Sequence, residues 1–166
     1  MVAGPLRVLF AEDNSAHATL VVRSLEEHGI QVRITHVHDG EEALSYLQRR
    51  GAYSDPRSSP RPDLVLLDLR MPKIDGLEVL RQIKSSDELH RLPVVILTTS
   101  EAEADVARAY DLRANSYLVK PIDFQRFSDL MHDLGLYWSK WNKSPPTDRP
   151  APTRIDGDPA ATRPIS

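Results

Sequence analysis

The sequence predicts an α/β fold of the doubly wound type, in which one five-stranded parallel sheet is flanked by five helices. Two observations predict this fold. Short apolar runs of strand length alternate five times with longer segments whose apolar residues recur at helical spacing. Polar residues directly follow most of the apolar runs. Strands that alternate with helices form parallel sheets with right-handed crossovers and helices on both faces, and ligands bind at the carboxyl ends of such strands.

The first strand and helix are marked at both ends. Residues 6–11 (LRVLFA) form an apolar run of strand length. Asn14 or Ser15 is placed to cap a helix over residues 16–28, and Gly29 is placed to end it. This segment therefore predicts a strand, an acidic tip and a helix.

The next segment predicts an edge strand, a helix and a long loop. Residues 30–37 (IQVRITHV) alternate like a strand with one wetter face, which is typical of a strand near the sheet edge. A helix is expected after Gly40, because apolar residues recur on one face of the segment that follows. Residues 51–62 hold three prolines among small and polar residues, and therefore predict a loop.

The second half of the chain predicts the remaining elements. The apolar runs indicate strands at residues 63–68, 93–97 and 116–119. Helices are predicted at residues 76–85 and 101–112, and from Phe124 onward. The last of these carries an apolar stripe that predicts core packing. The stripe consists of Phe124, Phe127, Leu130, Met131 and Leu134.

Composition narrows the class of protein. The 166 residues are 40% hydrophobic and 27% charged, which fits one folded domain with an appendage. A net charge of −3 without a basic run argues against a nucleic-acid partner. The absence of cysteine excludes disulfides and thiol chemistry. Neither a signal peptide nor an apolar run of about 18 residues is found, so we expect a cytoplasmic protein without a membrane partner.

The domain boundary is predicted near residue 142. Residues 1–142 are expected to form the folded domain with an extended C-terminal helix. Residues 143–166 are expected to form a disordered tail, since six prolines and few apolar residues cannot offset the entropy of ordering.

Polar residues follow four of the predicted strands and are expected to meet at one edge of the sheet. Three carboxylates there would repel one another unless a cation lay among them, and oxygen ligands without histidine or cysteine favour Mg²⁺. A threonine hydroxyl and a lysine supply what a transferred phosphoryl group needs. Asp68 is the carboxylate placed to act as the nucleophile and to form an aspartyl phosphate. The set is Glu12, Asp13, Asp68, Thr98 and Lys120.

These motifs resemble the receiver domain of two-component response regulators. The matching stretches are AEDN, DLRMPKIDG, VVILTTS and SYLVKP, in this order and spread over about residues 6–135. The resemblance implies that Glu12 and Asp13 form an acidic Mg²⁺ pocket, although many relatives have aspartate where this chain has Glu12. It further implies that Asp68 is the phosphoacceptor and that the backbone carbonyl of Arg70 is another metal ligand.

The resemblance also implies roles for residues on the other side of the site. Thr98 would bond to the phosphoryl group, and Lys120 would pair with it. Tyr117 matches the family's switch aromatic, which turns inward when the threonine hydroxyl moves. Arg70 and Ser100 stand at positions that tune attack by water, so the lifetime of the phosphoryl group is left open.

Partner surfaces are expected on two sides of the domain. His17, Leu20 and Pro121 lie where receivers of this type dock the kinase helix that carries the phosphohistidine, although a role as surface residues without function stays open. Three aromatic residues follow the predicted core and indicate a homodimer surface, since such residues are enriched at interface centres. They are Tyr137, Trp138 and Trp141. The alternative is that these aromatics fold back and cap the edge of the domain.

The C-terminal extension and the loop before residue 63 also resemble the single-domain response regulators associated with bacterial phytochrome kinases. The expected function is therefore to accept a phosphoryl group from a histidine kinase, such as a phytochrome, or from a phosphotransfer protein. The chain is not expected to be an enzyme, with autophosphatase activity left open. A haloacid-dehalogenase-like phosphatase would need a second aspartate where this chain has Arg70. A phosphorylation-independent interaction module is the remaining alternative.

Overall fold

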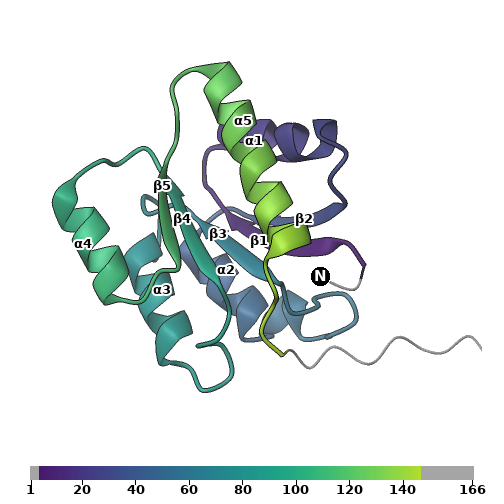
Figure 1. Cartoon of the computed structure of the whole chain (residues 1–166). Coiled ribbons are helices and arrows are strands. Elements are labelled where there is room, and N and C mark those ends of the chain that lie inside the picture. The colour runs from purple at the N-terminus through teal and green to yellow at the C-terminus, as the bar shows by residue number, and fades with distance from the viewer. Residues whose placement is uncertain (1–3, 147–166) are drawn as a thin grey trace, which may run out of the picture.

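The structure, a computed structural model, describes residues 4–146 of the chain. Within these residues, five parallel strands form one sheet in the order β2-β1-β3-β4-β5 (Figure 1). The strands are β1 (Leu6–Ala11), β2 (Val32–Val37), β3 (Leu64–Leu67), β4 (Val94–Thr98) and β5 (Ser116–Val119). The α-helices are α1 (Ser15–Glu27), α2 (Gly40–Leu47), α3 (Gly76–Ser85), α4 (Glu103–Asp111) and α5 (Phe124–Leu136). The doubly wound prediction is confirmed.

The predicted helix starts have a local cause in side-chain caps. The side chain of Asn14 accepts hydrogen bonds from two backbone amides in the first turn of α1. An aspartate before each of α2, α3 and α5 accepts one from the third helical residue. These bonds satisfy amides that a helix start leaves without partners. Helix α4 has no side-chain cap and begins two residues later than predicted.

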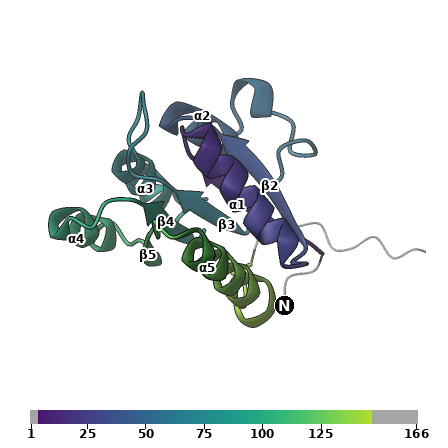
Figure 2. The ribbon, with the colours of Figure 1, turned by 90° about the horizontal axis from the view of Figure 1, so that it is seen from above.

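Helices cover both faces of the sheet (Figure 2), and an apolar layer lies beneath them on each face. Helices α1 and α5 pack on one face, and α2, α3 and α4 pack on the other. Strands β3 and β4 are buried along their whole length, whereas β2 lies at the sheet edge and is mostly half-buried. The prediction of an edge strand over residues 30–37 is therefore confirmed. Continuous burial of β3 explains why its sequence, LVLL, is apolar on both faces.

The end of α5 corrects two predictions. A π-helical turn, Tyr137–Trp141, continues the helix, and it buries Trp138 to 7% exposure in the core layer of α1 and α5. Trp138 therefore packs inside the domain, as the alternative interpretation of the aromatics expects, because it extends the spacing of Met131 and Leu134 on the same helix face. Phe124 was predicted to pack in the core but is 60% exposed, because it lies at the start of α5, beyond the end of β5.

Gly76, the first residue of α3, lies against the backbone that follows β3. A Cβ atom at this position would overlap the carbonyl oxygen of Asp68 and lie 2.7 Å from Cα of Leu69. We expect Gly76→Ala to lower the free energy of unfolding by about 1–3 kcal/mol, because backbone atoms must move to admit the methyl group. Urea unfolding followed by circular dichroism measures this change. An unaltered midpoint would contradict the close approach of α3 to this segment.

Two further expectations concern the ends of the chain and the membrane. Among residues 4–146, none of the helices has the length and apolarity needed to cross a bilayer. Most of the predicted disordered tail, residues 147–166, lies outside the described residues.

Candidate functional site

The three carboxylates predicted to meet are neighbours at the carboxyl ends of β1 and β3. Glu12, Asp13 and Asp68 each offer an oxygen atom, and these atoms lie within 4.8 Å of one another. They converge because β1 and β3 are adjacent in the sheet, and the amide of Asp68 donates to the carbonyl of Ala11 at 3.1 Å. Glu12 and Asp68 are buried, whereas Asp13 is exposed and leaves the cluster open to solvent on one side.

Lys120 reaches the same cluster from the end of β5. Its Nζ donates to Oε2 of Glu12 at 2.5 Å and to Oδ2 of Asp68 at 3.4 Å, and its side chain is buried. The backbone of Lys120 is held by its amide, which donates to the carbonyl of Thr98 at the end of β4. The ammonium group of Lys120 therefore contacts two of the three carboxylates, and one cation among three acids leaves the cluster with an excess of negative charge.

The pKa of Glu12 reflects both its burial and the charge of its neighbours. Burial raises the pKa of Glu12 to about 7, and the neighbouring Asp68 acts in the same direction, while the hydrogen bond and charge of Lys120 oppose the shift. A divalent cation would favour the charged form of such a carboxylate. The cluster also suits Mg²⁺ in its shape, because this ion binds through one or two carboxylates and keeps several waters, and the side of Asp13 is open to solvent. The residues present thus fit a magnesium site.

Thr98 and Tyr117 lie beside the cluster in a connected hydrogen-bond network. Thr98 is fully buried at the end of β4, and its hydroxyl oxygen accepts from the amide of Ser100 at 3.4 Å. The hydroxyl of Tyr117 donates to the carbonyl of Ser100 at 2.9 Å. Both residues therefore form hydrogen bonds with Ser100, in the short segment between β4 and α4. A displacement of Thr98 would change the position of this segment.

Asp105, on α4, was missed by the sequence prediction. Its Oδ2 accepts from the hydroxyl of Ser100 at 2.6 Å and from the guanidinium of Arg70 at 3.3 Å. It thereby joins the two positions that the resemblance assigns to the control of water attack. An acid in the first turn of a helix is too common to be singled out in the sequence.

The backbone of Arg70 was predicted to contribute a metal ligand. Its amide donates to Oδ1 of Asp68 at 3.4 Å, which places its backbone beside the carboxylate cluster. The role of its carbonyl as a metal ligand stays a prediction.

Two of the three predicted partner residues, His17 and Pro121, lie beside the cluster, at its rim, whereas Leu20 is half-buried and packs against the core layer of α1 and α5. Nδ1 of His17 accepts from Nζ of Lys120 at 3.2 Å, and burial together with this ammonium group lowers the pKa of His17. Pro121 follows Lys120 directly and is half-buried. Ile122, which is fully exposed, and the exposed Phe124 extend this rim; neither was predicted from the sequence to belong to it.

Five helices around a five-stranded parallel sheet, with acids, a threonine and a lysine gathered at one edge, define a response regulator receiver domain. A comparison with protein families matches residues 8–132 to the response regulator receiver domain. The chain belongs to this family. Receiver domains interact with histidine kinases or phosphotransfer proteins, bind Mg²⁺ or Mn²⁺ at an acidic site, and are in general phosphoacceptors without enzymatic activity.

Individual relatives confirm the predicted resemblance to phytochrome response regulators. The chain is 40% identical to response regulator Rcp1 of Synechocystis, over 81% of this chain and 89% of that protein. It is similar in structure to the phosphorylated cyanobacterial phytochrome response regulator RcpA, with a TM-score of 0.81 and 36% identity over 86% of this chain and all of that one. The Mn²⁺-bound form of Rcp1 matches with a TM-score of 0.79 and 38% identity, over the same shares of the two chains.

A further relative belongs to another context. The chain is 47% identical to the probable methanogenesis regulatory protein FilR2 of Methanothrix harundinacea, over 85% of this chain and 88% of that protein. Similarity at this level therefore extends to a protein whose name carries no reference to a phytochrome.

Proposed function

We propose that the chain accepts a phosphoryl group on Asp68 from a histidine kinase or a phosphotransfer protein and thereby switches a protein-interaction surface. The observation that carries this proposal is the position of Asp68. Its carboxylate lies close to those of Glu12 and Asp13 and 3.4 Å from the ammonium group of Lys120. A phosphoryl group on this carboxylate would meet positive charge from the lysine and from a bound cation.

The proposed transfer has a simple balance of bonds. A carboxylate oxygen of Asp68 forms a bond to phosphorus, the bond from phosphorus to the donor's imidazole nitrogen breaks, and that nitrogen keeps the electron pair and takes a proton. When bound, Mg²⁺ offsets the charge on the phosphoryl oxygens. Lys120 pairs with one of these oxygens, and the buried hydroxyl of Thr98 donates a hydrogen bond to another. Movement of Thr98 would then be transmitted to Tyr117 through the segment at Ser100.

The proposal is tested by intact-protein mass spectrometry after incubation with acetyl phosphate and Mg²⁺. We expect one added phosphoryl group, which is lost on treatment with hydroxylamine because an acyl phosphate is labile to this nucleophile. An adduct that resists hydroxylamine would place the phosphoryl group on a hydroxyl side chain. No adduct would favour the phosphorylation-independent interaction module.

Mg²⁺ binding is expected to depend on Asp13. We expect Asp13→Asn to weaken Mg²⁺ affinity by about tenfold or more, because the variant removes one of the charges that face the ion. Titration calorimetry with MgCl₂ measures this loss. The control is Asp111→Asn, which makes the same change at an exposed residue of α4, outside the cluster, and should leave the affinity unaltered. Equal affinities in the two variants would remove Asp13 from the metal site.

We further propose that the kinase is of the phytochrome type and docks at a surface that includes His17, Leu20 and Pro121. The likeness to Rcp1 and RcpA supports the kinase class, since RcpA is a cyanobacterial phytochrome response regulator. The exposed apolar side chains of Ile122 and Phe124 support the docking surface, because they lie next to the site and have no core to pack against. The rates of phosphorylation by a phytochrome kinase and by unrelated histidine kinases test the kinase class. We expect the phytochrome kinase to be faster, and equal rates would contradict this proposal.

We also propose a homodimer that uses the end of α5. Tyr137 is 53% and Trp141 77% exposed, so both aromatics are available to a second copy. We expect the wild type to scatter light as a dimer and Trp141→Ala to shift toward the monomer mass as it is diluted. A mass that stays that of a monomer at every concentration would contradict the proposal.

A further inference from the structure

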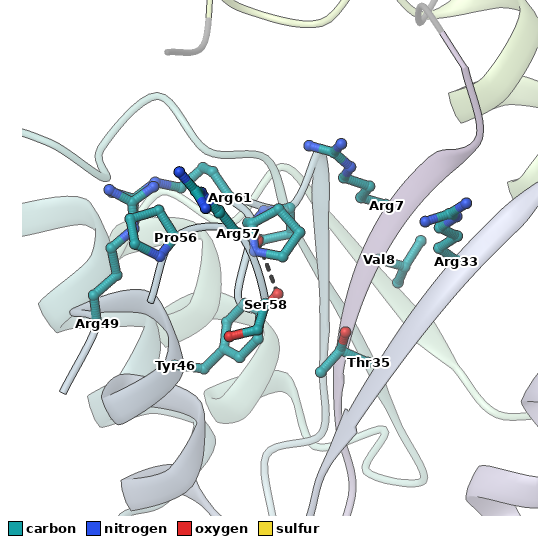
Figure 3. A pocket seen from close by; sticks show the side chains of 12 residues that line it. Arg7, Val8, Arg33, Thr35, Tyr46, Arg49, Pro56, Arg57, Ser58 and Arg61 are labelled. Atoms are coloured by element: carbon teal, nitrogen blue, oxygen red, sulfur yellow. Dashed lines mark hydrogen bonds between the residues drawn. The ribbon is translucent and has the colours of Figure 1, made fainter. Parts of the chain in front are cut away.

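A cavity, shown in Figure 3, is lined by residues of β1, β2, α2 and the loop that precedes β3, and it includes none of the acidic cluster. Its volume is about 530 Å³, and it opens between the starts of β1 and β2, the end of α2, and the loop over residues 51–62. This loop is the segment whose length the acceptor site does not explain. Five of the twelve lining residues are arginines, and none is acidic. The arginines are Arg7, Arg33, Arg49, Arg57 and Arg61.

Most of this positive charge is not neutralised by the protein. Within residues 4–146, the guanidinium groups of Arg7, Arg33, Arg49 and Arg57 form no ion pair. Arg61 is different, because it donates to the carbonyl of Leu47 and lies 3.8 Å from an exposed glutamate. Four uncompensated cations on one cavity are unexpected in a chain whose net charge is −3. Their mutual repulsion would be relieved by an anion.

The cavity is held in shape by hydrogen bonds. The hydroxyl of Tyr46 donates to the carbonyl of Pro60 at 2.8 Å, which ties the loop to α2. Arg61 makes a second tie to α2 through the carbonyl of Leu47, at 2.6 Å. The amide of Arg7 donates to Asp63 at 2.9 Å, and the amide of Asp63 donates back to the carbonyl of Arg7. The guanidinium groups therefore project from a fixed backbone.

Tyr46 lies in the wall of the cavity, close to several of the arginines. Burial raises the pKa of its phenol, while a hydrogen bond with Thr35 and the charges of Arg7, Arg49 and Arg61 act in the opposite direction. Three of the arginines are thus close enough to favour a negative charge at the Tyr46 hydroxyl.

We propose that this cavity binds a small anion that carries two or more phosphoryl groups. Guanidinium groups bind phosphoryl oxygens through paired hydrogen bonds, and four of them here are available. The volume lies in the range of small-ligand sites and is larger than one phosphate group needs. The arginines that line the cavity come from β1, β2, the end of α2 and the loop, so one ligand would contact guanidinium groups from several elements.

Ligand binding here does not compete with phosphorylation for the same groups. Arg7 and Arg33 are the second residues of β1 and β2, whereas the acidic cluster follows the last residues of β1 and β3. No residue lines both sites. The two functions can therefore fail separately in an experiment.

The test is titration calorimetry of the full chain with sodium tripolyphosphate and with a nucleoside triphosphate, in EDTA. Without a metal ion the acidic cluster repels these anions, so binding reports the arginine cavity. The test variant is the double substitution Arg33→Gln with Arg57→Gln; both side chains are exposed, so we expect the fold to be kept. The control is Arg23→Gln with Arg126→Gln, which makes the same change of charge at exposed positions on α1 and α5.

We expect tripolyphosphate to bind the wild type and the control equally, and the test variant about tenfold or more weaker. Tighter binding of the nucleotide than of tripolyphosphate would support the same site with a contribution from the nucleoside. No binding at millimolar concentration, or equal loss in both variants, would overturn the proposal. Preference for a duplex oligonucleotide over both small anions would also overturn it and would indicate a nucleic-acid surface.

Discussion

The Asp68→Asn variant is expected to take up no phosphoryl group from acetyl phosphate or from a kinase, whereas the wild type takes up one. The amide keeps the shape of the side chain but lacks the negative charge that makes the carboxylate oxygen a nucleophile. The substitution also removes one carboxylate from the cluster with Glu12 and Asp13, so Mg²⁺ affinity should fall as well. Intact mass after incubation with acetyl phosphate and Mg²⁺ measures the first effect.

Loss of the fold would give the same result, so stability is measured in parallel. Asp68 contributes to the repulsion that raises the pKa of Glu12, and its contact with Nζ of Lys120 is longer than that of Glu12. We therefore expect the unfolding midpoint of Asp68→Asn to equal or exceed that of the wild type. Asp111→Asn is the matched control and should be phosphorylated normally. A phosphoryl group on Asp68→Asn would place the acceptor elsewhere.

Trp138→Ala is expected to lower the free energy of unfolding by about 3–5 kcal/mol, the range for removal of a large aromatic side chain from a core. Trp138 packs in the apolar layer between the sheet, α1 and α5, with Phe127 and Leu134 in the same layer. Truncation to alanine leaves a cavity there that the surrounding helices fill only in part. Urea unfolding followed by far-ultraviolet circular dichroism measures the change without relying on tryptophan fluorescence.

Trp141→Ala provides the matched control within the same turn of helix. Its side chain is 77% exposed, so the same substitution should change monomer stability by only about 0.5 kcal/mol or less. The comparison is made at a concentration where both variants are monomers, because loss of a dimer would also lower apparent stability. Similar losses for the two variants would contradict the inward position of Trp138.

The fold and the proposed acceptor site were accessible from sequence for the same physical reason. Each strand is a short run of strand-forming residues, and in four of the five the site residues are the last residue of the strand or follow within two residues of its end. In a parallel sheet the carboxyl ends of the strands lie on one edge, so local order along the chain already implies that Glu12, Asp68 and Lys120 meet. Helix caps such as Asn14 are local in the same way, and these positions needed no knowledge of long-range packing.

Other features depend on which surfaces pack together. Trp138 and Trp141 look alike in sequence, and only the position of α5 against α1 decides that one is buried and the other exposed. Asp105 joins Arg70 to Ser100 because α4 lies beside the ends of β3 and β4, which no local pattern encodes.

The sequence by itself determined the order of the elements and the acidic, threonine and lysine positions of the acceptor site, because these follow from periodicity and from strand ends. Only the tertiary structure decided that Trp138 is buried and that five arginines line one cavity. These arginines are Arg7, Arg33, Arg49, Arg57 and Arg61. Those arginines are dispersed along the chain and form no motif. Their proximity results from the parallel pairing of β1 with β2 and from the loop that packs on α2, which are contacts between distant segments.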